Sequence, residues 1–173
     1  PVASSSFNNP QGITLDNAGN LWVVDSGNHT IRKINLVTKT VETVAGQAGS
    51  LGTADGAGVL ARFNSPVGIA VLTESVSQNL ERFRLAGRPP EVTLIVADTG
   101  NGLLRRVKAG GQVETLTVAA SGASLEPAKA WAANPAAVPM RFDSPTGVAV
   151  DASGNIYATE PGTGLVKTVL PNG

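Results

Sequence analysis

The chain has 173 residues, is 42% hydrophobic and contains 20 glycines and 11 prolines, a composition that supports a sizeable core and is typical of turn-dense β structure. Thirteen basic residues balance thirteen acidic ones, so the clustered basic excess of nucleic-acid-binding proteins is missing. The chain has no cysteine, which excludes disulfides and thiolate zinc sites, and no apolar run approaches the roughly 20 residues of a membrane-spanning helix.

The first predicted unit, about residues 7–46, reads as four short strands. A turn is expected at residues 16–20, Asp-Asn-Ala-Gly-Asn, because Asn and Gly tolerate the positive φ that a hairpin needs. The segments beside it are rich in β-branched residues or alternate apolar and polar residues, as strands do. The expected strands lie at residues 12–16, 21–25, 30–36 and 38–46.

This unit recurs along the chain. The pattern Phe-Asn-x-Pro-x-Gly begins at Phe7 and Phe63, and it returns at Phe142 with Asp143 in place of Asn. Such repeats indicate stacked copies of one supersecondary unit, and four-stranded sheets repeated radially are the blades of a propeller. We therefore expect an all-β fold, a β-propeller of four-stranded antiparallel blades. Three blades are present in a single segment, residues 1–173, at about residues 7–46, 63–118 and 142–173.

Two segments depart from the repeat. The insertion at residues 72–91 predicts a short helix near 75–86, because Val76, Leu80 and Phe83 share one helical face. These three residues and Arg84 are candidates for contact with a partner. The second departure, residues 119–139, carries Trp131, which we expect either to cover the propeller face or to anchor an interface. The Gly-rich residues 52–58 lack the Lys-Ser/Thr of a phosphate loop and are expected to be a linker.

The block at residues 20–34, which contains Asn-His-Thr-Ile-Arg-Lys-Ile, and the linker before Phe63 resemble the NHL-repeat family. The second copy has Gly102 where the family has His, and the third has Glu160 in place of Asp. The resemblance implies a β-propeller, usually of six blades, that serves mostly as a binding platform. Some propellers of this kind are zinc lyases that use several histidines around the metal.

The residues offer few signs of chemistry. His29 is the single histidine, whereas a zinc site usually takes three or four ligands, so a structural role in its turn is expected. The carboxylates Asp25, Asp98 and Glu160 recur at the end of the second strand of each unit. They could line a channel and bind calcium, but we expect each to accept hydrogen bonds from backbone N–H groups two or three residues on. We therefore predict no catalytic residue, no metal ligand and no cofactor.

Some surface features remain open. Asn28-His29-Thr30 is an N-glycosylation sequon in a predicted turn, so Asn28 is a candidate glycan site. Two basic triplets could contact an acidic partner or polysaccharide, although a solvated face is expected for both. They are Arg82, Arg84 and Arg88, and Arg105, Arg106 and Lys108.

Three blades do not close a ring, and the third unit ends at the turn where its fourth strand should begin. Residues 1–6 make poor strand material. An open ring would expose blade faces and a strand edge. We therefore expect further blades of a longer polypeptide, or another subunit, to complete the ring.

The expected function is a non-enzymatic interaction or structural module, a protein- or glycan-binding platform or assembly subunit. The alternative is a metal-dependent propeller lyase or hydrolase whose active site needs further blades. Neither nucleic acid nor a membrane span is expected. The location stays open, with a secreted or cell-surface, extracellular scaffold protein favoured.

Overall fold

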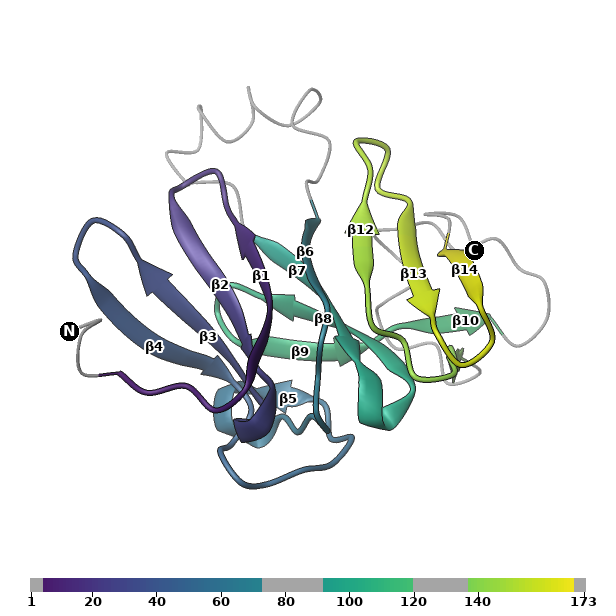
Figure 1. The fold of residues 1–173 in the computed structure, drawn as a ribbon, viewed down its shortest axis with the longest axis horizontal. Coiled ribbons are helices and arrows are strands. Elements are labelled where there is room, and N and C mark those ends of the chain that lie inside the picture. Colours follow the sequence, from purple (N-terminus) through teal and green to yellow (C-terminus); the bar gives the residue numbers. More distant parts are fainter. Residues whose placement is uncertain (1–4, 73–91, 120–136, 170–173) are drawn as a thin grey trace.

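The computed structural model describes residues 5–72, 92–119 and 137–169. Three antiparallel sheets lie side by side (Figure 1), and we call them blades 1, 2 and 3 in chain order. The strands β1 (Pro10–Leu15) and β12 (Val148–Val150) of the outer two blades both lie next to β6 (Ile69–Leu72) of the middle blade. The expected all-β propeller fold is confirmed.

Blade 1 is a four-stranded meander. It has the order β1-β2-β3-β4 and is formed by Pro10–Leu15, Asn20–Asp25, Thr30–Asn35 and Thr40–Ala45. The β1–β2 turn contains Gly19 at φ 78°, as the Asn/Gly-rich turn predicts. A single 3₁₀ turn, η2 (Ser26–Asn28), joins β2 to β3.

Blade 2 has five strands rather than the expected four. Its order is β5-β9-β8-β7-β6, formed by Gly56–Ala57, Gln112–Thr115, Leu103–Lys108, Thr93–Asp98 and Ile69–Leu72. The extra strand, β5, comes from the segment expected to be a linker, and it pairs with β9. Two further 3₁₀ turns are η3 (Gly58–Leu60) and η4 (Thr99–Asn101).

Blade 3 has three strands among the described residues. They are β12 (Val148–Val150), β13 (Ile156–Glu160) and β14 (Leu165–Val169). A separate two-stranded ribbon joins β10 (Thr117–Ala119) to β11 (Ala137–Pro139) at the base of the second departure.

The apolar core is divided between the two seams where neighbouring blades meet. Trp22, Val24 and Ile31 of blade 1 pack with Phe63, Leu94 and Val96 at the first seam. Ile95, Ala97 and Leu104, on the opposite face of blade 2, pack with Phe142, Ile156 and Ala158 at the second. Alternate residues of β7 in blade 2 therefore face opposite neighbours, as the period of two in a strand requires.

The described residues contain 3₁₀ turns and no α-helix. The helix predicted near residues 75–86 lies outside the described residues. Within the part of the chain that the structure describes, no helix is long and apolar enough to cross a membrane.

Candidate functional site

The repeat builds one cluster of three side chains in each blade, an aromatic ring, a carboxylate and a cation, which we call the seam cluster. In blade 2 it consists of Phe63, Asp98 and Arg105, all fully buried. The Arg105 guanidinium lies 5.2 Å from the centroid of the Phe63 ring and donates to Asp98 Oδ2 at 2.9 Å. Asp98 Oδ1 accepts the backbone N–H of Asn64 at 2.8 Å. The carboxylate thus ties the start of the blade to its middle strands.

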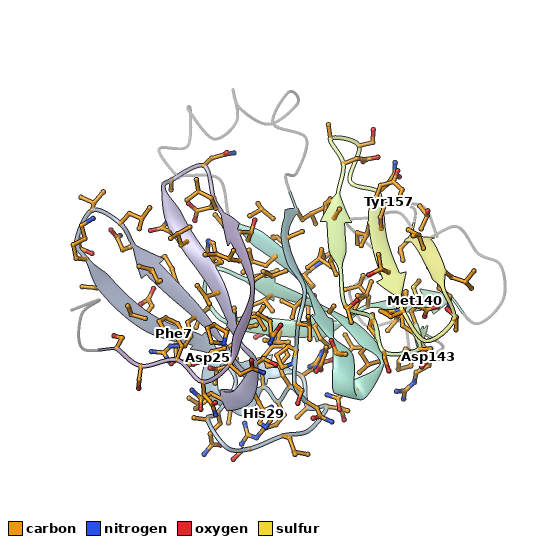
Figure 2. The ribbon with its side chains drawn as sticks, in the orientation of Figure 1. Phe7, Asp25, His29, Met140, Asp143 and Tyr157 are labelled. Atoms are coloured by element: carbon orange, nitrogen blue, oxygen red, sulfur yellow. The ribbon has the colours of Figure 1, made fainter. Side chains whose placement is uncertain are left out.

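Blades 1 and 3 repeat this geometry. In blade 1, Arg32 lies over Phe7 at 5.2 Å and donates to Asp25 at 3.1 Å, and Asp25 accepts the N–H of Asn8 at 2.7 Å. Figure 2 shows Phe7 and Asp25 at the same end of blade 1. Blade 3 substitutes Lys167, Glu160 and Phe142, with the ammonium 5.4 Å from the ring centroid and 2.9 Å from the carboxylate. Each cation follows its carboxylate by seven residues.

The sequence-based prediction of which N–H groups donate to these carboxylates is wrong. They accept the N–H of the residue after each Phe, not of residues two or three further on. The residue three on does contribute, but through its side chain: Asn28, Asn101 and Thr163 donate to the second oxygen of Asp25, Asp98 and Glu160. The carboxylate therefore joins two segments that are far apart in the chain.

The seam carboxylates differ in their electrostatics. Burial raises the pKa of Asp98, although the hydrogen bonds from Asn64, Asn101 and Arg105 oppose this effect. The hydrogen bond from Lys167 lowers the pKa of Glu160. Blade 3 therefore has a Lys–Glu pair where the other two blades have Arg–Asp. This pair keeps the ion pair, the backbone N–H donor and the cation–ring contact of the other seam clusters.

Arg105 contradicts the expectation of a solvated face for its basic triplet, because its side chain is completely buried. Its Nη1 donates to the carbonyl of Arg62 at 2.9 Å, and its Nη2 donates to the carbonyl of Ala54 at 3.0 Å and to Asp55 Oδ1 at 2.7 Å. These acceptors, together with Asp98, engage both Nη atoms inside the protein, whereas the buried Nε has no hydrogen-bond partner among the described residues. In the same triplet, Arg106 and Lys108 are partly buried.

A second carboxylate organises the hairpin turns of blades 1 and 3. Asp16 accepts from the backbone N–H groups of Ala18 and Asn20, from the Asn20 amide and from Trp22 Nε1. Burial opposes ionisation, but these hydrogen bonds outweigh it and lower the pKa of Asp16. Asp151 has the same arrangement, with Tyr157 in place of the Trp, and the hydrogen bond from Asn155 leads in lowering its pKa.

His29 occupies a structural position. It has φ 58°, in the left-handed region, where the equivalent Gly102 and Gly164 have φ 63° and 70°. His29 Nδ1 accepts the backbone N–H of Ser65 at 3.0 Å, which links blade 1 to the start of blade 2. Figure 2 shows His29 at the turn between β2 and β3. The glycines of the other two copies meet the same backbone requirement without a side chain.

The sequon is engaged in the same network. Asn28 Nδ2, the atom that would carry a glycan, donates to Asp25 Oδ2 at 2.9 Å. The Thr30 side chain, the third position of the sequon, is buried. Glycosylation would replace one of the two Nδ2 hydrogens, so the other would have to keep the hydrogen bond to Asp25 for this contact to survive.

The structure brings together Phe7 with Asp25, Phe63 with Asp98, and Phe142 with Glu160. It also adds Arg32, Arg105 and Lys167, which the sequence analysis did not assign to them. The seven-residue spacing from carboxylate to cation could have identified these partners. Within residues 5–72, 92–119 and 137–169, no group of three His, Cys, Asp or Glu side chains could hold a metal ion. The interaction candidates Val76, Leu80, Phe83, Arg84 and Trp131 lie outside the described residues.

The family model of the NHL repeat matches residues 7–34. Over 115 residues the chain is 36% identical to Protein SUPPRESSOR OF QUENCHING 1, chloroplastic, of Arabidopsis thaliana, covering 65% of this chain and 9% of that protein. Over 44 residues it is 50% identical to NHL repeat-containing protein 2 of Bos taurus, covering 25% of this chain and 6% of that protein. The chain thus spans less than a tenth of the length of either relative.

Solved structures show the same fold. An auxiliary nutrient binding protein from Bacteroides thetaiotaomicron superposes with a TM-score of 0.66 at 21% identity, covering 90% of this chain and 36% of that one. A virginiamycin B lyase from Staphylococcus aureus gives 0.50 at 13% identity, covering 93% of this chain and 41% of that one. At these identities the likeness concerns the fold alone.

Proposed function

Because this chain carries an NHL repeat and folds as part of a β-propeller, we propose that it is a non-enzymatic interaction and structural module. In this proposal further blades, or another subunit, complete the ring, and the assembled ring binds a protein or glycan partner. The binding surface belongs to the loops and inserted segments, since such scaffolds hold their loops rigidly for recognition.

One observation carries the proposal: positions that are buried at the internal seams are exposed on the outer flanks. Ile69 of blade 2 is 7% exposed, whereas Ile13, which follows the repeated Gly in the same way in blade 1, is 61% exposed. Ile31 and Leu104 are fully buried, whereas Val166, at the same place in blade 3, is 67% exposed. The side chains that cover a neighbouring blade are therefore present on both flanks.

The ionisable groups support a structural use of these blades. The seam clusters engage Asp25, Asp98 and Glu160 with cations and backbone N–H groups, and His29 accepts a hydrogen bond from the next blade. A lyase or hydrolase mechanism would need ligands from other blades. Zinc or calcium at one ion per chain in the purified protein would contradict the proposal.

The flanks can be tested by light scattering after size-exclusion chromatography. We expect the chain to associate, and Ile13→Asp or Val166→Asp to weaken that association because each places a charge on a seam face. Val37→Asp is the matched control, since Val37 lies in the β3–β4 turn and is 85% exposed. Equal effects of the three substitutions, or a chain that stays monomeric at every concentration, would contradict the proposal.

A further inference from the structure

Residues 51–62, which we call the strap, cross the outer side of blade 2 and are held there by a specific set of contacts. Asp55 Oδ1 accepts from Arg105 Nη2 at 2.7 Å and from the Thr115 hydroxyl at 2.9 Å. The next two strap residues, Gly56 and Ala57, pair with Val113 and Gln112 at the outer edge of β9. A segment with a single carboxylate thus adds a short strand to the blade.

Blade 1 contains the same groups that contact the strap in blade 2. Val41-Glu42-Thr43 of β4 repeats Val113-Glu114-Thr115 of β9. The register agrees as well: Thr43 lies opposite Arg32, as Thr115 lies opposite Arg105, and each Arg stacks on the Phe of its own seam cluster. The three groups that hold the strap in blade 2, the guanidinium, the hydroxyl and the strand edge, therefore have counterparts in blade 1, and so does the aromatic ring on which the Arg stacks.

In blade 1 these groups are more exposed than their counterparts in blade 2. Arg32 is 16% exposed where Arg105 is buried, Thr43 is exposed and Phe7 is half-buried. Among the residues that the structure describes, Arg32 makes one hydrogen bond, to Asp25, whereas Arg105 makes four. No described strand pairs with the outer edge of β4.

We propose that the outer edge of β4, with Arg32 and Thr43, binds a second strap of the same chemistry. This strap is an extended peptide segment that supplies one carboxylate to both side chains and pairs its main chain with Val41 and Thr40. Strand addition supplies main-chain hydrogen bonds, and the carboxylate fixes the register on the guanidinium. An apolar segment would satisfy the strand edge but would give no acceptor to the Arg32 donors that Asp25 does not engage. The inference concerns this edge alone and does not depend on whether the flank of blade 1 is covered.

The test presents the strap at high effective concentration in the whole chain. Residues 1–6 are replaced by a second copy of residues 51–62, which places the copy before Phe7 as the native strap precedes Phe63. Hydrogen–deuterium exchange then follows the β4 amides. We expect their exchange to slow by about tenfold or more, as for an edge that becomes hydrogen-bonded. The native chain and a copy in which the residue matching Asp55 is Asn are the controls.

Four outcomes decide the proposal. Slower exchange in β4 that is lost with the Asn copy, and lost again with Arg32→Gln, supports the strap site. Unchanged exchange in the fused chain overturns the proposal. Equal protection from the Asp and Asn copies also overturns it, because the carboxylate would then have no role. Protection of β4 of the native chain by inorganic phosphate alone would indicate an anion site instead and would overturn the strap.

Discussion

Replacing Phe63 with Ala tests the role of the repeated aromatic residue at the first seam. Phe63 is fully buried in a cluster that joins side chains of blades 1 and 2, and Arg105 stacks on its ring. Truncating a buried Phe costs about 3–5 kcal/mol, and loss of a desolvated cation–π contact adds about 1–2 kcal/mol. We therefore expect Phe63→Ala to lower the free energy of unfolding by about 4–7 kcal/mol, a large part of the roughly 5–15 kcal/mol that stabilises a typical domain.

Phe7→Ala is the matched control, because Phe7 has the same repeat position and the same Arg contact but is half-buried. Half-burial of a Phe side chain contributes about 1 kcal/mol, so this variant should cost about 1–2 kcal/mol. Urea unfolding followed by tryptophan fluorescence measures both variants. A cost below about 1 kcal/mol for Phe63→Ala, or equal costs for the two variants, would refute the assignment of Phe63 to the seam.

The remaining predictions concern polar groups. Arg105→Met leaves Asp98 buried without its cation and should cost about 3–5 kcal/mol of unfolding free energy. Arg32→Met, at a partly exposed ion pair, should cost less. Similar losses of unfolding free energy for the two variants in denaturant titrations would argue against the strap contacts. The pKa of Asp16 is lowered in the folded protein from its ordinary value of 3.8, so its carboxylate contributes stability above pH 3.8 that is lost as the pH falls through the folded pKa. The difference in unfolding free energy between wild type and Asp16→Asn should therefore shrink from about pH 5 to pH 3. A difference that stays constant in unfolding curves across that range would contradict this. His29→Gly should fold normally, because glycine adopts φ 58° without strain, whereas Gly102→Val should be destabilised by steric overlap with the Phe142 carbonyl; equal melting temperatures for the two variants would contradict the backbone argument.

The repeated Phe-Asn-x-Pro-x-Gly pattern was sufficient to predict the antiparallel blades and the placement of Phe63 and Phe142. Local pattern could not predict β5, because Gly56–Ala57 has no strand propensity. That strand depends on Arg105 and Thr115, which lie far along the chain from Asp55. A strand that exists through tertiary contacts leaves no periodic signal in its own residues.

The seam clusters were predicted in part. The recurrence of Asp25, Asp98 and Glu160 drew attention to the right carboxylates, but an Asp before a turn favours local hydrogen bonds as the expectation. Their cations were missed because an Arg on a strand is usually solvated. Burial of Arg105 becomes favourable only when Asp98, Asp55 and two carbonyls converge on it, which requires the fold.

Hydroxyl-radical footprinting of the native protein tests the central claim, because it reports the exposure of individual side chains. The account predicts that Ile13 and Val166, exposed on the flanks of this chain, are labelled as slowly in the assembled protein as the buried Ile69 and Leu104. Val37, which lies in the β3–β4 turn, should be labelled rapidly both in this chain alone and in the assembled protein. If Ile13 and Val166 are labelled as fast as Val37 in the assembled protein, the flanks are not covered and the proposed completion of the ring is wrong.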